Sequence, residues 1–211
     1  MGGLVALADD FYSLRSGWAE QGFSDLSEDR WDALEKYGRI LYAWSGKMNL
    51  LSRSERNLIA TRHTWRGLAL AQIIETRTPR TIIDVGSGAG IPAVPIKICL
   101  PDVETYLVES RRKRANFLRT VVRELRLEKI HVVNERIENW QSGVAADIFT
   151  ARAVARPSVL QSWMTNHASG GATLVCTLSS DFTVAESQRL QIRSLSWGGQ
   201  SMRVGLFPIE S

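Results

Sequence analysis

Cysteine and long apolar runs are both scarce in this sequence of 211 residues. The two cysteines, Cys99 and Cys176, are too few for a disulfide framework or a metal site, and their apolar surroundings are typical of reduced core residues. No apolar run approaches the roughly 18 residues that a membrane helix needs. The N-terminus also lacks the basic start of a signal peptide. We therefore expect a cytoplasmic protein without a metal.

A strong overall charge is missing too, since the formal net charge is only +4. A hydrophobic fraction of 44% and a charged fraction of 23% fit a globular protein with one sizeable core. Positive charge is nevertheless concentrated between Arg111 and Lys129, where eight basic residues face two acids. Such a local excess suits a polyanionic partner, although a solvated helix face would have the same composition.

The first 75 residues carry apolar side chains at helical spacing. One short helix is expected over 9–18, and a second after Ser27, which two acids follow as at a helix N-cap. Ser52-Arg-Ser-Glu55 fits a capping box for a third helix that runs to about Glu75. We therefore expect residues 1–75 to form an N-terminal helical extension.

After Thr78-Pro79-Arg80, in residues 76–211, short apolar runs alternate with helical stretches. The predicted strands are 81–85, 104–109, 130–134, 147–150 and 172–177, and the predicted helices are 91–99, 111–126 and 157–167. Two more strands, 190–197 and 202–209, flank a glycine pair and predict an antiparallel edge. This order predicts an α/β fold with a mostly parallel, Rossmann-like sheet. It resembles the class I S-adenosylmethionine-dependent methyltransferase domain.

A glycine-rich turn, Gly86-Ser-Gly-Ala-Gly90, follows Asp84 at the end of the first predicted strand. Glycine permits positive φ and close approach of a ligand, and the next helix would offer free N–H groups to an anion. The dinucleotide fingerprint needs glycine at position 91 or 93, where Ile91 and Ala93 stand; alanine is sometimes tolerated in the second case. The spacing therefore favours S-adenosylmethionine, whose carboxylate would be the anion.

Glu109 ends the second predicted strand, about 20 residues beyond the glycines. An acid at this place can accept hydrogen bonds from both ribose hydroxyls of a nucleoside. It could equally cap the helix that begins near Arg111, and the two roles are compatible.

Four arginines of the predicted helix 111–126 lie within about 60° on a helical wheel. They are Arg112, Arg119, Arg123 and Arg126. The apolar residues occupy a different face, so we expect an exposed arginine stripe suited to phosphate oxygens. The alternative is a solubility role, with Glu124 and Glu128 as partners.

Several short motifs agree with one protein family in order and spacing from Trp44 to Ala153. They are Trp44, Asn49-Leu50, Arg62-His63, Asp84-Val-Gly86-Ser-Gly88-Ala-Gly90-Ile-Pro92, Glu109-Ser110, Lys113, Phe117-Leu118-Arg119, Arg136-Ile-Glu138, Asp147 and Arg152-Ala153. With these residues the chain resembles the glucose-inhibited division protein B family, the guanine-N7 methyltransferases of bacterial small-subunit (16S) ribosomal RNA.

The resemblance implies a class I methyltransferase with an N-terminal helical extension, acting as a monomer on ribosomal RNA or a ribosomal particle. Its expected cofactor, S-adenosylmethionine, would contact Asp84, Gly86, Ser87, Gly88, Ala89, Gly90, Glu109, Ser110, Ile137, Glu138 and Arg152. Expected RNA contacts are Arg62, His63, Arg112, Lys113, Arg119, Arg123 and Arg126. Arg152 would line the place where cofactor meets RNA, which makes it the candidate catalytic residue.

Two of these assignments have competitors. Arg152 could instead form a structural ion pair with Asp147 or Glu138. Trp44 and Trp65 could stack on a base, although their spacing also suits helix packing.

The expected chemistry needs no general base, because guanine N7 carries a lone pair and no proton. Amino-group methyltransferases usually show an (Asp/Asn)-Pro-Pro-aromatic motif after the fourth strand, and Thr150-Ala-Arg-Ala153 stands there instead. The protein would then act mainly by aligning the two reactants.

Three positions depart from the usual family pattern. Ala93 replaces a glycine, Arg66-Gly67 replaces Asp-Ser, and Thr177-Leu178 replaces Lys-Gly. They keep open a divergent paralogue that binds cofactor or RNA without this activity. An NAD-dependent oxidoreductase is a further alternative.

Overall fold

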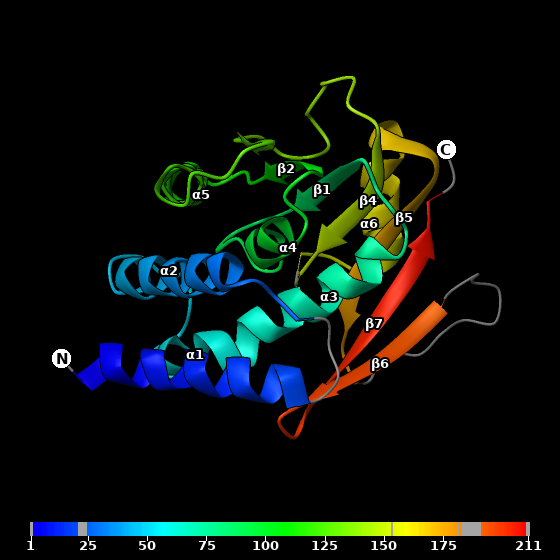
Figure 1. Cartoon of the computed structure of the whole chain (residues 1–211). Helices are drawn as coiled ribbons and strands as arrows, with labels where there is room; N and C mark the ends of the chain where they lie inside the picture. Colours follow the sequence, from blue (N-terminus) through cyan, green and yellow to red (C-terminus); the bar gives the residue numbers. More distant parts are fainter. Residues whose placement is uncertain (1, 21–24, 153, 181, 183–190, 210–211) are drawn as a thin grey trace.

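The computed structural model describes residues 2–20, 25–152, 154–180, 182 and 191–209, and it is built around one mixed sheet (Figure 1). The seven strands lie in the order β3-β2-β1-β4-β5-β7-β6. Their bounds are β1 Thr81–Val85, β2 Glu104–Val108, β3 Ile130–Val133, β4 Ala146–Ala151, β5 Ala168–Leu178, β6 Gln191–Trp197 and β7 Gln200–Pro208. Strands β1 to β5 pair in parallel, and β7 pairs antiparallel with β5 and β6. This confirms the predicted sheet and its antiparallel edge; the predicted strand start at position 190 lies outside the described residues.

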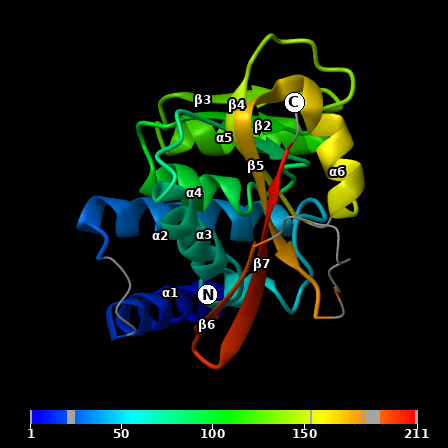
Figure 2. The same cartoon turned by 90° about the vertical axis from the view of Figure 1, so that its right-hand side faces the viewer.

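Helices cover both faces of this sheet (Figure 2). Their bounds are α1 Gly2–Glu20, α2 Glu28–Ser45, α3 Trp65–Glu75, α4 Ala93–Cys99, α5 Arg112–Glu124 and α6 Pro157–Met164, with short η1 Arg56–Leu58, η2 Ile59–Thr64 and η3 Thr165–His167. Side chains alternate across a strand, so neighbours in β1 enter different cores. Ile82 joins the core beneath α1–α5, whereas Ile83 joins the core beneath α6. No helix among the described residues is long and apolar enough to span a membrane.

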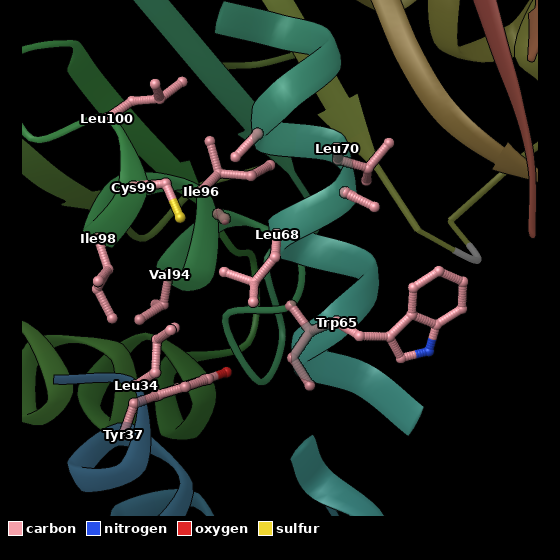
Figure 3. Packing of buried hydrophobic residues seen from close by; sticks show 14 of the residues in the cluster. Leu34, Tyr37, Trp65, Leu68, Leu70, Val94, Ile96, Ile98, Cys99 and Leu100 are labelled. Atoms are coloured by element: carbon pink, nitrogen blue, oxygen red, sulfur yellow. The ribbon is translucent and has the colours of Figure 1, made fainter. Parts of the chain in front are cut away.

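The core beneath α1–α5 joins the N-terminal helices to the sheet domain. Leu34 of α2 points towards Val94 of α4, and Leu68 of α3 reaches the same space (Figure 3). The Tyr37 hydroxyl of α2 donates a hydrogen bond to the Ala89 carbonyl of the glycine turn at 2.7 Å. The apolar spacing of the first 75 residues therefore corresponds to buried helix faces, as in α2, where Leu34 and Leu41 are fully buried. Helix α1 is longer than the segment 9–18 that the sequence predicted.

The segment from Ser52 to Glu75 is not the continuous helix that its capping box predicted. Glu55 does accept a hydrogen bond from the Ser52 backbone N–H at 3.1 Å, as in such a box. However, the carboxylate of Asp10 in α1 accepts the backbone N–H groups of Ala60 and Thr61, at 2.6 and 3.1 Å. These groups are thereby removed from a helical ladder, and the segment divides into η1, the π-helical η2 and α3.

The carboxyl ends of β1, β2, β4 and β5 meet at one edge of the sheet. Val85 is in register with Val108 of β2 and Ala151 of β4, and Ala151 with Cys176 of β5. The strand order reverses between β1 and β4, since β2 and β3 lie on one side and β5 on the other. In open α/β sheets such a switch point forms the ligand crevice.

Candidate active site at the carboxyl edge of the sheet

The glycine turn after β1 has the backbone conformation that its sequence predicted. Gly86, Gly88 and Gly90 have φ of +70°, +53° and +81°. A Cβ at Gly86 would lie 2.6 Å from Val154, and one at Gly90 would lie 2.7 Å from Val94. At Gly88 the nearest atom to an added Cβ would be a terminal nitrogen of Arg114, 3.6 Å away. The outer two glycines therefore permit tight packing, while the middle one leaves room for a ligand beside the backbone.

Asp84 brings a buried carboxylate to this turn. It is 1% exposed, and its Oδ1 accepts a hydrogen bond from Thr150 Oγ1 at 2.6 Å. Its Oδ2 is buried with no hydrogen-bond partner among the described residues. Burial raises the pKa of Asp84 to about 6, while hydrogen bonding by the Thr150 and Ser87 hydroxyls and, after them, the charge of Arg152 oppose that rise. An unpaired buried carboxylate oxygen is costly unless a donor satisfies it, so Oδ2 is an acceptor available to a bound group.

Glu109 ties the glycine turn to the end of β2. The side chain is 4% exposed, and its carboxylate accepts hydrogen bonds from the Gly88 N–H at 2.9 Å and the Arg111 N–H at 2.7 Å. The capping role is thus present at the start of α5. Each carboxylate oxygen retains a further lone pair, so the predicted contact with ribose hydroxyls stays compatible with these bonds.

Three other predicted cofactor contacts lie beside the same edge. Ser110 is exposed, and its carbonyl accepts the Asn134 side-chain amide at 3.1 Å. Ile137 is buried in the core cluster that holds Val85 and Val108, while Glu138 is exposed in the same turn. The turn after β3 therefore lies near the ends of β1 and β2, where its contact with an adenine remains a prediction.

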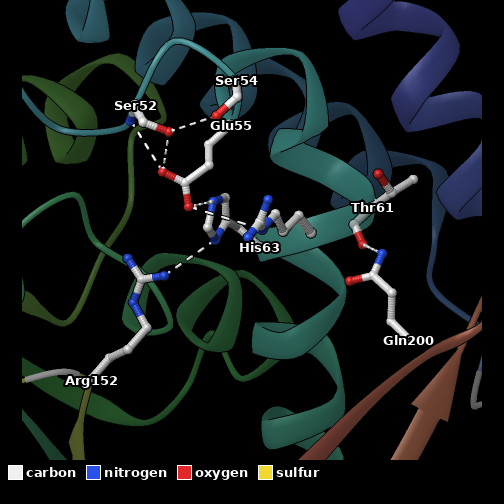
Figure 4. A network of polar contacts seen from close by, with 8 residues as sticks. Ser52, Ser54, Glu55, Thr61, His63, Arg152 and Gln200 are labelled. Atoms are coloured by element: carbon white, nitrogen blue, oxygen red, sulfur yellow. Dashed lines mark hydrogen bonds and ion pairs between the residues drawn. The ribbon is translucent and has the colours of Figure 1, made fainter.

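Arg152 follows β4 and contacts His63 of η2, not either predicted acid (Figure 4). Its guanidinium lies 3.2 Å from His63 Nδ1, and His63 Nε2 lies 3.4 Å from Glu55 Oε1. An arginine can only donate, so Nδ1 is the acceptor and Nε2 carries the proton. Burial and the charge of Arg152 lower the pKa of His63 to about 4, so the ring is neutral near pH 7.

The predicted alternative of an Arg152–Asp147 pair is wrong. The Asp147 carboxylate accepts the backbone N–H groups of Arg80 and Thr81 at 2.8 and 3.1 Å, and the Ser169 hydroxyl at 2.9 Å. These partners lie at the amino ends of β1 and β5, across the length of the strands from Arg152. Asp147 therefore fastens the sheet and leaves Arg152 to the site.

A cleft of roughly 390 Å³ adjoins Arg152 between α3 and the ends of β5 and β7. We call it the Arg66 cleft; its lining includes Arg66, Arg152, Thr177, Ser179, Ser201 and Arg203. The sequence marked positions 66 and 177 as separate departures from a family pattern. The fold brings both to one place, next to the residue predicted to meet the RNA.

Comparison with known proteins shows the family to which the chain belongs. Residues 30–200 match the family model described as rRNA small subunit methyltransferase G. The chain belongs to this family. The match leaves the alternative of an NAD-dependent oxidoreductase without support.

Curated relatives from several bacteria carry the name Ribosomal RNA small subunit methyltransferase G. The Bacillus velezensis protein is 40% identical over 149 residues, which are 69% of this chain and 62% of the relative. The Staphylococcus aureus protein is 36% identical over 139 residues, which are 64% of this chain and 58% of the relative. The matched part of the chain thus spans about 60% of the length of these relatives.

Solved structures at low identity share the fold. SAH-bound methyltransferase PaMTH1 from Podospora anserina has a TM-score of 0.58 at 11% identity and covers 92% of this chain and 94% of its own. A methyltransferase from Geobacter sulfurreducens has a TM-score of 0.58 at 12% identity, covering 92% and 95%. They confirm the predicted Rossmann-like methyltransferase fold.

The predicted RNA contacts fall into an exposed and a buried group. Arg112, Lys113, Arg119 and Arg123 are exposed on α5, and the side chain of Arg62 is 47% exposed. His63 is only 3% exposed, so the prediction of a direct RNA contact is wrong for this side chain. It is held instead between Arg152 and Glu55.

The arginine stripe is shorter than predicted. Helix α5 ends at Glu124, and Arg126 follows it with a φ of +52°, so Arg126 is exposed but lies off the helix. Arg123 has an ion pair with Glu124 at 3.2 Å, one of the partners foreseen for a solubility role. Arg119 donates to Asn116 at 2.9 Å.

The two tryptophan candidates also differ in the structure. Trp65 is fully buried and stacks on Trp197 with ring centroids 6.3 Å apart, so it cannot stack on a base. Trp44 is partly buried against Phe117 at 5.6 Å. The spacing of both residues reflects helix packing.

The structure explains one departure from the family pattern. A Cβ at Gly67 would lie 2.6 Å from Pro95 of α4, so the serine usual at this position would not fit here without a shift. The sequence interpretation missed three supporting residues: Thr150, which bonds to Asp84, Tyr37, which bonds to Ala89 of the glycine turn, and Asp10, which bonds to the start of η2. The register of Asp84 with Thr150 could have revealed the first, once β1 and β4 were known to be neighbours.

Proposed function

We propose that this protein transfers the methyl group of S-adenosylmethionine to N7 of a guanine in small-subunit (16S) ribosomal RNA, free or within the ribosomal particle. The observation that carries the proposal is the family match over residues 30–200, which encloses the candidate site from Glu55 to Ser180 and leaves out only the β7 wall of the Arg66 cleft, Ser201 to Arg203. The cytoplasm is the matching location, since the substrate is assembled there. We also propose that residues 1–75 form an extension of a methyltransferase domain at 76–211, and that the protein acts as a monomer.

The residues around the glycine turn fit the cofactor. Asp84 Oδ2, buried and without a partner among the described residues, can accept N–H bonds from the ammonium group of its methionine part. Gly88 leaves space beside the backbone, and Glu109 has lone pairs for the ribose hydroxyls. Gly86, Ser87, Ala89, Gly90 and Ser110 would complete the contact, with Ile137 and Glu138 beside the adenine. When bound, this cofactor supplies a methyl group on a sulfonium, which is already an activated electrophile.

The protein's own task is then to orient the guanine. N7 carries no proton, so no side chain has to remove one, and the contribution is positional. Arg152 lies close enough to Asp84 to affect its pKa and also lines the Arg66 cleft. Its donors can hold guanine O6 and leave N7 free to face the methyl group. The contact with His63 fixes the position of the Arg152 guanidinium. Arg62, Arg112, Lys113, Arg119, Arg123 and Arg126 would contact phosphates at the surface.

A methylation assay on small ribosomal subunits from a strain lacking this modification tests the proposal. We expect N7-methylguanosine in the digested RNA, identified by mass. The control is Arg152→Ala, which should stay folded and bind S-adenosylhomocysteine while losing most of the product. If the folded wild-type protein binds S-adenosylhomocysteine and yields no N7-methylguanosine on free RNA or subunits, the proposal fails and the non-catalytic paralogue is favoured.

A further inference from the structure

The Arg66 cleft holds more positive charge than its surroundings neutralise. Burial lowers the pKa of Arg66, the charges of Arg152 and Arg62 lower it further, and Glu55 is the acid that opposes this change. The Glu55 carboxylate is already engaged by Ser52 at 2.6 Å and faces His63 at 3.4 Å. The described residues that line the cleft include three arginines, Arg66, Arg152 and Arg203, and no acid, and this imbalance favours an anion.

Arg66 itself has an unmet hydrogen-bonding need. Its Nε is buried with no partner among the described residues, and its guanidinium lies 5.8 Å from the Trp65 ring centroid. Trp65 is fully buried, so the aromatic surface beside Arg66 is fixed. The residue as a whole is half-buried and lines the cleft, so the remaining N–H groups of its guanidinium are the donors that an acceptor within the cleft can reach.

The opposite wall supplies hydroxyl groups on an anchored loop. Thr177, Ser179 and Ser201 line the cleft from β5, its following loop and β7. Arg203 donates to the carbonyls of Ser179 and Ser180 at 3.2 and 3.1 Å, which holds this loop against β7. Guanidinium and hydroxyl donors together are the usual ligands of RNA phosphates.

We propose that the Arg66 cleft binds a phosphodiester of the RNA strand beside the target guanine, with Arg66 as the residue that sets this contact. The proposal rests on the proposed function, because Arg152 connects the cleft to the site of methyl transfer. Where the family usually has an acid at position 66 and a lysine at position 177, this chain has Arg66 and Thr177. Both positions line the same cleft, Arg66 from α3 and Thr177 from β5.

The test is the affinity for unmodified small ribosomal subunits, measured over a range of KCl concentrations. Arg66→Ala should weaken binding about tenfold and lower the salt slope by roughly one, the value for one phosphate contact. Arg66→Lys keeps the charge but loses the paired N–H donors of the guanidinium, so its affinity should lie between those of the wild type and Arg66→Ala. Arg39→Ala is the matched control: it removes an equal charge from the exposed face of α2, where Arg39 pairs with Glu35, and should leave binding unchanged.

Moving the positive charge from position 66 to position 177 tests whether the effect is specific to this cleft. Arg66→Asp should bind more weakly than Arg66→Ala, and adding Thr177→Lys to Arg66→Asp should restore most of the affinity. S-adenosylhomocysteine affinity and the thermal midpoint should stay at wild-type values throughout. The inference is overturned if Arg66→Ala matches Arg39→Ala, if Thr177→Lys gives no rescue, or if cofactor affinity falls in parallel. A wild-type protein that binds subunits but does not methylate them refutes the proposed function alone.

Discussion

The glycine loop and the Arg66 cleft both border Arg152, yet they are built in opposite ways. At the loop, carboxylates and backbone N–H groups are buried and paired, apart from one oxygen of Asp84. In the cleft, cations are half-buried and outnumber acids. The loop also keeps the family's residues, whereas the cleft carries two of the three departures. A small cofactor of fixed shape needs binding groups at fixed positions, whereas a phosphate can be bound by a cation from either side of the Arg66 cleft.

The largest expected effect comes from adding one methyl group to the loop. Gly90→Ala would place a Cβ 2.7 Å from Val94 at a φ of +81°. We expect a loss of about 2–4 kcal/mol in the free energy of unfolding and no measurable binding of S-adenosylhomocysteine. Denaturant unfolding and calorimetry measure the two quantities.

Gly199→Ala is the matched control for that substitution. Gly199 has a φ of +75°, and nothing lies within 4 Å of its added Cβ, so only backbone strain of about 1 kcal/mol is expected. Equal losses for both variants would show that packing at Gly90 has no importance.

Asp84→Asn should separate binding from stability. Removing the buried charge should weaken S-adenosylhomocysteine binding roughly 30-fold, because the acceptor for the ammonium group loses its charge. The unliganded protein should become more stable by roughly 2 kcal/mol at pH 7, since burial raises the pKa of Asp84 to about 6.

The pH dependence checks that explanation. An acid whose pKa is raised on folding lowers stability as the pH rises from about 4 to about 6. The stability gained by Asp84→Asn should therefore grow across this window and level off above it. A gain that is constant from pH 4 to 7 would contradict the assignment.

His63→Ala should have a smaller effect, because the histidine acts by positioning Arg152. We expect kcat to fall about tenfold while the KM for S-adenosylmethionine is unchanged, and His63→Asn, which retains an acceptor, to recover part of the rate.

Burial lowers the pKa of His63 to about 4, so its contribution to stability is present above about pH 6.5 and is lost as the pH falls towards 4. The change of stability with pH that His63 causes is therefore opposite in sign to the change that Asp84 causes. Measuring one variant of each residue separates the two contributions. Equal rates for the Ala and Asn variants would argue against positioning.

The smallest effects are expected on the exposed face of α5. Arg112→Ala or Arg119→Ala should weaken subunit binding only about two- to threefold, because exposed charges are screened by salt. Arg123→Ala should have even less effect, since Arg123 is paired with Glu124. A loss at Arg119 as large as that at Arg66 would remove the distinction between cleft and stripe.

Local patterns predicted most of the fold. The strands were recognisable as short apolar runs, and the positive φ values of Gly86, Gly88 and Gly90 follow from their spacing after β1. The end of α5 was not predictable in this way, because a non-glycine residue, Arg126, adopts positive φ there. The division of the segment between η1 and η2 was not predictable either, because it depends on Asp10, 50 residues away in the chain from Ala60. The Arg66 cleft is nonlocal in the same sense, since α3, β5 and β7 meet only in the folded protein.

The most direct test of the account is a crossed measurement of KM on small ribosomal subunits with Asp84→Asn and Arg66→Ala. We predict that Asp84→Asn raises the KM for S-adenosylmethionine and leaves that for subunits unchanged, while Arg66→Ala does the reverse. Equal changes in both KM values for either variant would contradict the claim that Arg152 stands between two separate binding regions.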